Sequence, residues 1–286
     1  MPVLHAPAKI NLTLEILGRR PDGYHRLRSV AVPISLYDEI TVEPGGRGIE
    51  FRSNSREIQT YDNLVVKALA ALEAPQSNFK IFLKKCIPIG AGLGGGSSDA
   101  AAILLASMQG VFGKLGRRDY LAIARRLGSD VPFFLTQTAA IVEGTGERIT
   151  PLGAVPRWGC TILRPPLTIA TADAYRQFFP ASNSRPRDSS ATIELGEALQ
   201  RSELARVQTL AQNDFEPWAA TQYPDVAVAL KALSDWNGGF AHLTGSGSCV
   251  YTIYEHVPQA PLEFPEGFER FDAGFVGSAV WRSQSA

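Results

Sequence analysis

The chain has 286 residues, and its 28 Lys and Arg residues balance its 28 Asp and Glu residues. Hydrophobic residues make up 45% of it, which excludes a disordered or fibrous chain, and the even charge gives no sign of a nucleic-acid or membrane partner. Cys86, Cys160 and Cys249 are widely spaced and form no CxxC pair, which favours reduced thiols over a disulfide or zinc framework. Without a signal sequence or an apolar run of membrane-spanning length, we expect a cytoplasmic protein of two modest domains or one large one.

The first part of the chain is predicted to be rich in strands. Residues 9–16 alternate between polar and apolar side chains, which is the period of a strand with one buried face. The apolar face is Ile10, Leu12, Leu14 and Ile16, and the polar face is Lys9, Asn11, Thr13 and Glu15. After turn residues at 18–23, further strands are predicted at 30–36, 39–43 and 79–85.

Helices and strands are mixed in the rest of the chain, and Ser97 is placed as the N-cap of one helix. Helices are predicted at 63–72, 97–109, 119–127, from 172 onward, at 193–210 with a break, and at 215–236. Strands are predicted at 159–163, 240–244 and 249–254, and the polar stretch 181–191 is predicted to be a loop. A boundary near residues 153–157 would divide the chain into domains 1–155 and 156–286. The layout is α+β in two layers, without a repeated βαβ unit.

The segment from Pro88 to Ser98 carries five glycines between a predicted strand and a predicted helix. Glycines let several backbone N–H groups turn toward one point, and a helix N-terminus adds unpaired donors and its dipole, which suits phosphate. Ser97 stands where a Walker A loop has its lysine, and the GxGxxG pattern that begins at Gly90 lacks a later acidic residue for a ribose. A flexible loop without a ligand fits poorly with a Ser-Ser-Asp helix start. We therefore predict a phosphate site that belongs to neither motif.

This segment resembles the central phosphate-binding motif of the GHMP kinases, which comprise galacto-, homoserine, mevalonate and phosphomevalonate kinases. Pro7–Leu12 and Leu243–Cys249 stand where the other motifs of that family fall. Within the family, the chain is similar to the branch that phosphorylates a cytidine-diphosphate-linked methylerythritol. The segments that carry this likeness are Pro21–His25, Asp62–Leu64, Gly92–Asp99 and Gly128–Pro132. The resemblance covers essentially the whole chain, and it implies a two-domain fold with the active site in the cleft between the domains.

The resemblance assigns the catalytic roles to Lys9 and Asp130 and the phosphoryl donor role to ATP. Asp130 would accept a proton from the 2-hydroxyl of the substrate, and Lys9 would keep Asp130 ionised and contact the transferring phosphoryl group. Lys9 lies on the polar face of the first strand, and Asp130 lies in a turn after Gly128. The plain structural alternatives are a solvated strand face for Lys9 and a helix cap before Pro132 for Asp130.

The acceptor site that the resemblance implies consists of Asn11, Tyr24, His25, Thr171 and Tyr175. Asn11 is on the same strand face as Lys9 and is therefore expected to reach the same pocket. Tyr24 would stack on the cytosine ring while His25 reads its polar edge. Tyr175 would supply a second stacking face from the second domain, with Thr171 beside it. The alternative for Tyr175 is a core aromatic residue of its helix.

The nucleotide site implied by the resemblance is the glycine segment with two residues outside it. Its residues are Pro88, Ile89, Gly90, Ala91, Gly92, Leu93, Gly94, Gly95, Gly96, Ser97, Ser98, Asn63 and Lys85. Lys85 is equally well placed as a surface residue at a strand end, and the turn Gly245–Ser248 either lies beside the phosphate loop or is a plain hairpin turn. Since no carboxylate pair suggests a metal centre in the protein, we expect Mg²⁺ to be held mainly by ATP, with sparse help from Ser97 and Ser98.

Two other functions stay open at this point. Another GHMP kinase, acting on mevalonate, homoserine or a sugar, would not need the Tyr24–His25 segment or Tyr175. A non-catalytic nucleotide-binding regulator on the same fold would be favoured by the loss of Lys9 or Asp130, and both are present. In either case we expect a small-molecule substrate or ligand, no nucleic acid, and a monomer or weak dimer.

Overall fold

The computed structural model describes residues 3–21, 23–58, 62–72, 78–112, 119–177 and 190–277. The strands are β1 (Val3–Asn11), β2 (Thr13–Arg19), β3 (His25–Pro44), β4 (Ile49–Ser53), β5 (Phe79–Lys84), β6 (Ala139–Gly144), β7 (Arg148–Gly153), β8 (Gly159–Arg164), β9 (Gln212–Asn213), β10 (His242–Leu243), β11 (Val250–Tyr254) and β12 (Glu269–Gly274). The α-helices are α1 (Leu64–Ala71), α2 (Gly95–Met108), α3 (Tyr120–Leu127), α4 (Val131–Leu135), α5 (Thr171–Gln177), α6 (Ser190–Gln200), α7 (Leu204–Leu210), α8 (Glu216–Gln222) and α9 (Pro224–Trp236), with a short 3₁₀ helix at Arg56–Ile58. Asp22 and most of the predicted loop at 181–191 lie outside the described residues.

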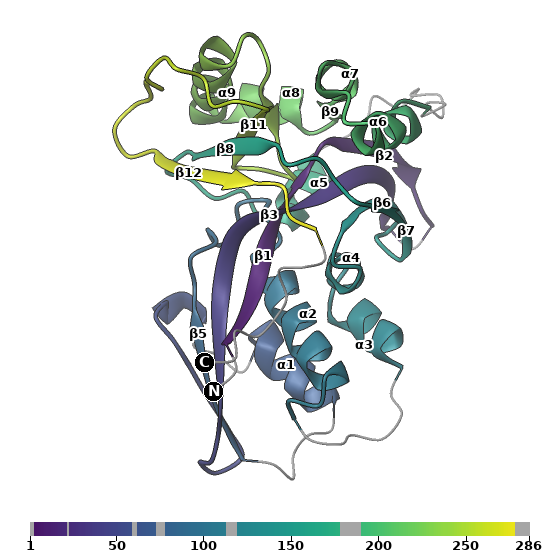
Figure 1. The fold of residues 1–286 in the computed structure, drawn as a ribbon, viewed down its shortest axis with the longest axis vertical. Helices are drawn as coiled ribbons and strands as arrows, with labels where there is room; N and C mark the ends of the chain where they lie inside the picture. Colours follow the sequence, from purple (N-terminus) through teal and green to yellow (C-terminus); the bar gives the residue numbers. More distant parts are fainter. Residues whose placement is uncertain are drawn as a thin grey trace.

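The first sheet is organised around β3, a strand of 20 residues that runs through most of the molecule (Figure 1). β1, β2, β5 and β6 all pair with it antiparallel. The two strands predicted at 30–36 and 39–43 are therefore one strand. A register shift opposite Pro7 and Ala8 accommodates the change of partner along β3 without ending it.

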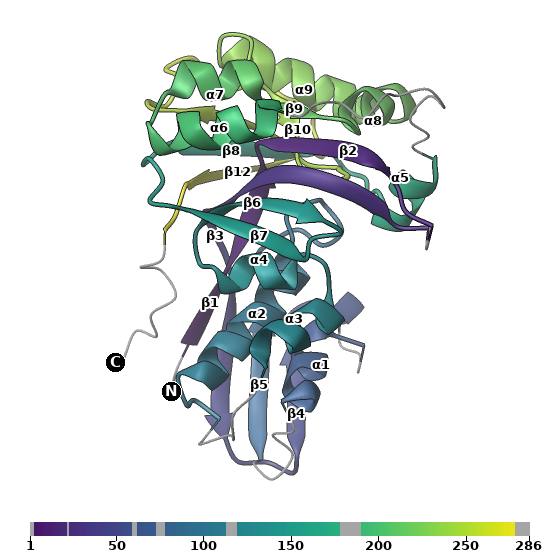
Figure 2. The ribbon, with the colours of Figure 1, turned by 90° about the vertical axis from the view of Figure 1, so that its right-hand side faces the viewer.

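Four helices cover one face of the first sheet in the lower part of Figure 1, where α2 lies between α1, α3 and β1 (Figures 1 and 2). α2 has an almost wholly buried surface because its side chains from Ser98 to Ser107 are small or aliphatic and pack on both the sheet and the neighbouring helices. Among the described residues, no helix has both the length and the apolar character needed to cross a membrane.

The second sheet has the strand order β10-β11-β8-β12 and is antiparallel throughout. Figure 2 shows α6–α9 above this sheet, and α9 contacts both β11 and β8. One hydrophobic cluster joins the two sheets, since Ile10 and Val32 pack together with Cys160 and Tyr251. The predicted division after residue 155 falls in the segment between β7 and β8 and stays a prediction.

The expected half-buried first strand is wrong in one respect, because its polar face is buried as well. Lys9, Asn11, Thr13 and Glu15 are all at most 7% exposed. The cover comes from the second half of the chain: the Asn11 N–H donates to Thr244 Oγ1 at 3.1 Å, and Gln212 Nε2 donates to Glu15 Oε1 at 2.9 Å. The alternative of a solvated strand face for Lys9 is thereby excluded.

The helix after the glycine segment begins earlier than predicted. Ser97 is not its N-cap; α2 starts at Gly95, and Gly94 occupies the cap position with φ of 72°. Glycine adopts this left-handed conformation without a steric penalty, so the chain turns directly from the loop into the helix. Six elements, α4, β4, β6, β7, β9 and β12, were not predicted. The helices at 63–72 and 119–127 and the strand at 79–85 are confirmed to within one residue at each end.

Candidate active site

The glycine segment lies against Lys9 at the junction of β1 and α2. The Lys9 N–H donates to the Leu93 carbonyl at 2.9 Å, which fixes the loop to the first strand. A Cβ on Gly94 would lie 3.1 Å from the Phe134 ring and 3.2 Å from Lys9 Cγ. A side chain at Gly94 would therefore be crowded by Phe134 and Lys9, and its left-handed backbone also favours glycine. The N–H groups at the start of α2 are of the kind that bind an anion.

The turn Gly245–Ser248 packs on the loop backbone to backbone. Gly92, with φ of +80°, would place a Cβ only 2.2 Å from the Thr244 carbonyl oxygen. The Cys249 N–H donates to the Ala91 carbonyl at 3.3 Å, and Thr244 Oγ1 donates to the Gly92 carbonyl at 3.4 Å. The turn connects β10 and β11 as a hairpin, and it also lies beside the glycine loop, so both interpretations of this segment hold.

A buried ion cluster lies under the start of α2. The Lys85 ammonium is paired with Asp38 and, at 3.0 Å, with Asp99. Asp38 also accepts the backbone N–H groups of Cys86 at 2.7 Å and Ile87 at 2.9 Å. Because a Cβ on Gly95 would lie 3.0 Å from Lys85 Nζ, the ammonium is directly below the first helical residue. Lys85 is a buried lysine that supports the loop, not a surface residue at a strand end.

Burial and charge act in opposite directions on this cluster. Burial, strengthened by the negative charge of Asp38, raises the pKa of Asp99 to about 8, although the Lys85 ammonium opposes the shift. The two carboxylates raise the pKa of Lys85 and outweigh its burial. The charged form of Lys85 is thus favoured below the loop, while burial favours the protonated form of Asp99.

Lys9, Asn11 and Asp130 come together at the edge of the loop. Lys9 Nζ donates to Asn11 Oδ1, and the Asn11 amide is held in turn by Ser29. Burial lowers the pKa of the Lys9 ammonium, and the nearby negative charge of Asp130 works against that shift. Asp130 directly precedes α4, but its carboxylate does not cap that helix. Asp130 therefore occupies the N-cap position that the alternative gave it, but its carboxylate makes no capping hydrogen bond.

Ser97 and the Asp130 turn are neighbours, since Ser97 Oγ lies 3.7 Å from the position of a Cβ on Gly128. Ser98 differs from Ser97, because its hydroxyl is fully buried and has no hydrogen-bond partner among the described residues. Asn63 acts as the N-cap of α1, where its Oδ1 accepts the Val65 N–H at 2.8 Å. The nucleotide roles of Asn63, Ser97 and Ser98 stay predictions.

An aromatic group lies beside Asp130. The rings of His25 and Tyr175 are 5.2 Å apart with a 32° angle between their planes, and Tyr175 meets Phe215 edge-on at 4.9 Å. Burial, with the Asp130 charge, raises the pKa of the Tyr175 hydroxyl well above its usual range. Burial and the Arg19 charge lower the pKa of His25, which favours the neutral form of this imidazole. The pair thus offers an aromatic face and a neutral polar ring.

Tyr24 and Thr171 border this group from opposite halves of the chain. Tyr24 precedes β3 and has 65% of its surface exposed. Thr171 begins α5, where its Oγ1 accepts a hydrogen bond from Ser246 Oγ at 3.2 Å. The exposed Tyr24 ring contrasts with the half-buried Tyr175 ring, so the two predicted stacking faces differ in how strongly the fold holds them.

The sequence matches the GHMP kinases N terminal domain over residues 63–138 and the GHMP kinases C terminal domain over residues 195–269. The 4-diphosphocytidyl-2-C-methyl-D-erythritol kinase of Pelotomaculum thermopropionicum is 37% identical over 260 residues, which cover 89% of this chain and 90% of that protein. The enzyme of the same name from Symbiobacterium thermophilum is 38% identical over 252 residues, covering 86% and 88%. The chain belongs to the 4-diphosphocytidyl-2-C-methyl-D-erythritol kinase family. Its predicted α+β, two-domain GHMP kinase fold is confirmed.

Solved structures agree with this assignment. A crystal structure of a 4-(cytidine 5'-diphospho)-2C-methyl-D-erythritol kinase has a TM-score of 0.77 and 32% identity, with 96% of this chain and 99% of that chain covered. The homoserine kinase of Cytophaga hutchinsonii has a TM-score of 0.69 at 17% identity, with 97% and 95% covered. The second comparison shows a shared fold, which the GHMP kinases use for different acceptors.

Four residues of this kinase that hold the site together were missed in the sequence: Ser29, Asp38, Asn213 and Thr244. Asn213 fixes the Gly245 turn, because its Nδ2 donates to the carbonyls of Leu243 at 2.8 Å and Gly245 at 2.9 Å. Asp38 could have been noticed in the sequence, since an aspartate among strand residues is unusual. The others are ordinary polar residues whose importance follows only from long-range contacts.

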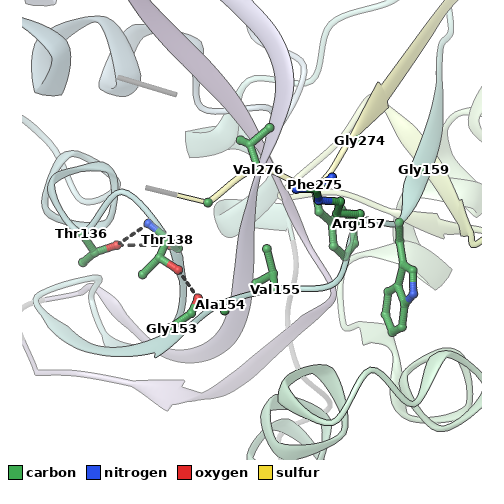
Figure 3. A pocket seen from close by; sticks show the side chains of 12 residues that line it. Thr136, Thr138, Gly153, Ala154, Val155, Arg157, Gly159, Gly274, Phe275 and Val276 are labelled. Carbon is green, nitrogen blue, oxygen red and sulfur yellow. Dashed lines mark hydrogen bonds between the residues drawn. The ribbon is translucent and has the colours of Figure 1, made fainter. Parts of the chain in front are cut away.

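A cavity of about 770 Å³ lies elsewhere in the kinase, between the end of β7 and the end of β12 (Figure 3). Its lining includes Trp158, Phe275 and Val276, and Arg157 is its one charged residue. No residue of the predicted site lines it. With no carboxylate and no phosphate loop at its wall, it lacks the groups needed for phosphoryl transfer.

Proposed function

We propose that this protein transfers the γ-phosphoryl group of ATP to the 2-hydroxyl of 4-diphosphocytidyl-2-C-methyl-D-erythritol, a step in making isoprenoid precursors. The observation that carries the proposal is the meeting of Lys9 and Asp130 at the edge of the glycine loop, with Tyr175 and His25 beside Asp130. The first pair supplies the transfer chemistry, and the aromatic pair supplies a surface for a pyrimidine.

Asp130 acts as the proton acceptor. Its carboxylate makes no capping hydrogen bond, and its negative charge acts on the nearby Lys9 ammonium. Lys9 donates to Asn11 Oδ1 with one of its three N–H groups, which leaves donors for the transferring phosphoryl group. The two residues thus handle the proton and the developing negative charge separately, as phosphoryl transfer requires.

The acceptor is held by its base and by its hydroxyl. A neutral His25 has one N–H donor and one acceptor nitrogen, which suits the polar edge of cytosine. Tyr175 offers its ring and Tyr24 a second one. The Asn11 amide uses one N–H for Ser29 and one lone pair of its oxygen for Lys9, so a second N–H and a second lone pair remain for the substrate.

ATP fits the cradle formed by Pro88–Ser98, where glycine backbone replaces side chains next to Lys9. Lys85, paired with Asp38 and Asp99, supports the loop from below at the first residue of α2. Mg²⁺ would accompany ATP. Among the described residues, no three His, Cys, Asp or Glu side chains converge on a point that suits a metal ion, so the phosphates of ATP would supply most of its ligands.

We also propose a cytoplasmic location, and a monomer or weak dimer stays our expectation for the oligomeric state. The support for the location is the cysteine pattern: Cys160 and Cys249 are buried free thiols, and Cys86 is an exposed one. Free thiols of this kind are typical of reducing compartments.

The deciding experiment measures ATP consumption with a panel of acceptors, namely the cytidine substrate, mevalonate, homoserine and galactose. We expect turnover with the cytidine substrate alone. Asp130→Ala should lower kcat by about 10²–10⁴-fold and leave ATP affinity, measured by calorimetry, within a few-fold. Asp235→Ala, which removes an exposed carboxylate from α9, is the matched control and should behave as the parent. Turnover of another acceptor in place of the cytidine substrate would overturn the proposal, and parent-like kcat in Asp130→Ala would remove that residue from the mechanism.

A further inference from the structure

A buried chain of hydrogen bonds leads from the catalytic lysine into β3. Lys9 Nζ donates to Asn11 Oδ1, Asn11 Nδ2 donates to Ser29 Oγ at 2.8 Å, and Ser29 Oγ donates to the Thr13 carbonyl at 2.5 Å. Ser29 is only 1% exposed. Water therefore cannot replace any member of the chain without a rearrangement of the strands.

The direction of these bonds follows from the chemistry of the groups. The backbone carbonyl of Thr13 can only accept, so it takes the single proton of the Ser29 hydroxyl. Toward Asn11, the hydroxyl can then only accept, and the NH₂ end of the amide is the only end that donates. The amide oxygen must therefore point to Lys9. An orientation of an amide is normally an assignment, but here the network permits one choice.

We propose that Ser29 is a positioning residue, which fixes the orientation of the Asn11 amide so that its oxygen faces the Lys9 ammonium. The inference rests on the proposed function for its catalytic meaning, because Lys9 acts on the transferring phosphoryl group. Ser29 itself touches Asn11 and Thr13, so its effect on Lys9 passes through the amide.

The orientation of the Asn11 amide matters because the Lys9 ammonium is a buried charge. Burial lowers its pKa, and Asp130 is the charged group among the described residues whose field opposes that shift. From the loop, Leu93 accepts the Lys9 backbone N–H and Gly94 brings no charge. The Asn11 oxygen is therefore the neutral acceptor that favours the ammonium form. A reversed amide would direct two N–H donors at the ammonium and favour the neutral amine.

The test measures the Lys9 titration directly, by NMR of protein labelled at lysine Cε, without any substrate. The Lys9 signal is identified by its loss in Lys9→Met. In Ser29→Ala we expect the titration midpoint to fall by about one pH unit, because the amide is free to reverse. In the acceptor assay, the alkaline limb of the kcat profile should move down by the same amount.

Two controls separate positioning from a general loss of structure. Ser107→Ala removes another buried hydroxyl, bonded to Tyr120 at 3.2 Å, and should leave the Lys9 midpoint unchanged. In an Asn11→Ala background, Ser29→Ala should produce no further shift, since the amide that transmits its effect is gone. If Ser29→Ala does not fold, Ser29→Cys carries the same expectation with a smaller shift, because a thiol is a weaker partner.

A parent-like Lys9 midpoint in folded Ser29→Ala, or in Ser29→Cys where the alanine variant does not fold, would overturn the proposal. An equal shift in the Asn11→Ala background would do so as well, because Ser29 would then act by another route. The titration does not depend on the acceptor. If the panel revealed a different substrate, the proposed function would fail while this result stood.

Discussion

Gly92→Ala tests whether the backbone contact between the glycine loop and the Gly245 turn stabilises the fold. The new Cβ would lie 2.2 Å from the Thr244 carbonyl oxygen and 3.2 Å from the Gly247 oxygen, at φ of +80°. The left-handed backbone costs an alanine about 1–2 kcal/mol, and forcing two backbones apart adds about 1–3 kcal/mol. We therefore expect the free energy of unfolding to fall by about 2–5 kcal/mol.

Gly96→Ala is the matched control in the same segment. Its φ is not positive, and the nearest protein atom to a Cβ is Leu64 Cδ1 at 3.6 Å. Since Gly96 is inside α2, alanine should leave stability unchanged or raise it by up to about 1 kcal/mol. Urea unfolding followed by tryptophan fluorescence, without nucleotide, measures both variants. A Gly92→Ala value within about 0.5 kcal/mol of the parent would refute the reasoning about this contact.

Two further predictions concern the ion cluster and the acceptor site. Because the pKa of Asp99 is raised to about 8, the folded state retains a proton that the unfolded state loses, and unfolding free energy should fall between about pH 4 and 8, by up to about 1.4 kcal/mol per unit. Asp99→Asn should flatten this slope in urea unfolding from pH 5 to 9, and parallel curves would contradict the shift. Tyr24→Ala and Tyr175→Ala should each raise KM for the cytidine substrate about 10- to 100-fold and leave KM for ATP little changed. Only Tyr175→Ala should lower the melting temperature, whereas an unaltered cytidine KM in both would refute stacking.

The sequence predicted local structure well where a local signal exists. Asp119 and Asn63 cap α3 and α1 through their side chains, as capping residues at those positions should. The five-glycine run predicted a loop that leads into a helix, since its signal lies within eleven consecutive residues, and the structure places α2 directly after it. The prediction of Ser97 as the N-cap was wrong because Gly94, in the left-handed conformation, precedes the helix without a side-chain cap. No polar residue at that position marks the start of the helix in the sequence.

The polar side chains of the first strand show that the sequence alone does not predict which distant residues will cover them. The strand predicted at 9–16 is two strands, since the chain bends at Leu12 between β1 and β2. Alternation also cannot say what covers the polar side chains Lys9, Asn11, Thr13 and Glu15. The cover comes from residues far along the chain: Thr192 Oγ1 donates to Glu15 Oε2 at 2.5 Å and lies 3.0 Å from Thr13 Oγ1. Such contacts depend on tertiary packing, which periodicity does not encode.

The same limit separates the candidate residues that short motifs predict from the supporting residues that only the structure reveals. Lys9, Asp130 and the glycines belong to short patterns with their own chemistry. Thr244, by contrast, belongs to a motif but acts through two distant partners, because its Oγ1 accepts the Asn11 N–H at 3.1 Å and donates to the Gly92 carbonyl at 3.4 Å. No pattern within the turn predicts either partner.

Thr244 also shows how one site is built from both halves of the chain. A hydroxyl with one proton and two lone pairs can link one donor and one acceptor in a fixed order. Here the donor belongs to β1, two residues after Lys9, and the acceptor belongs to the glycine loop. The distance between the proposed phosphoryl donor site and the strand that carries Lys9 and Asn11 is therefore set by a residue more than 200 positions away in sequence. Since phosphoryl transfer depends on positioning more than on covalent chemistry, this link from the C-terminal half is part of the proposed transfer site, and the two halves form that site only together.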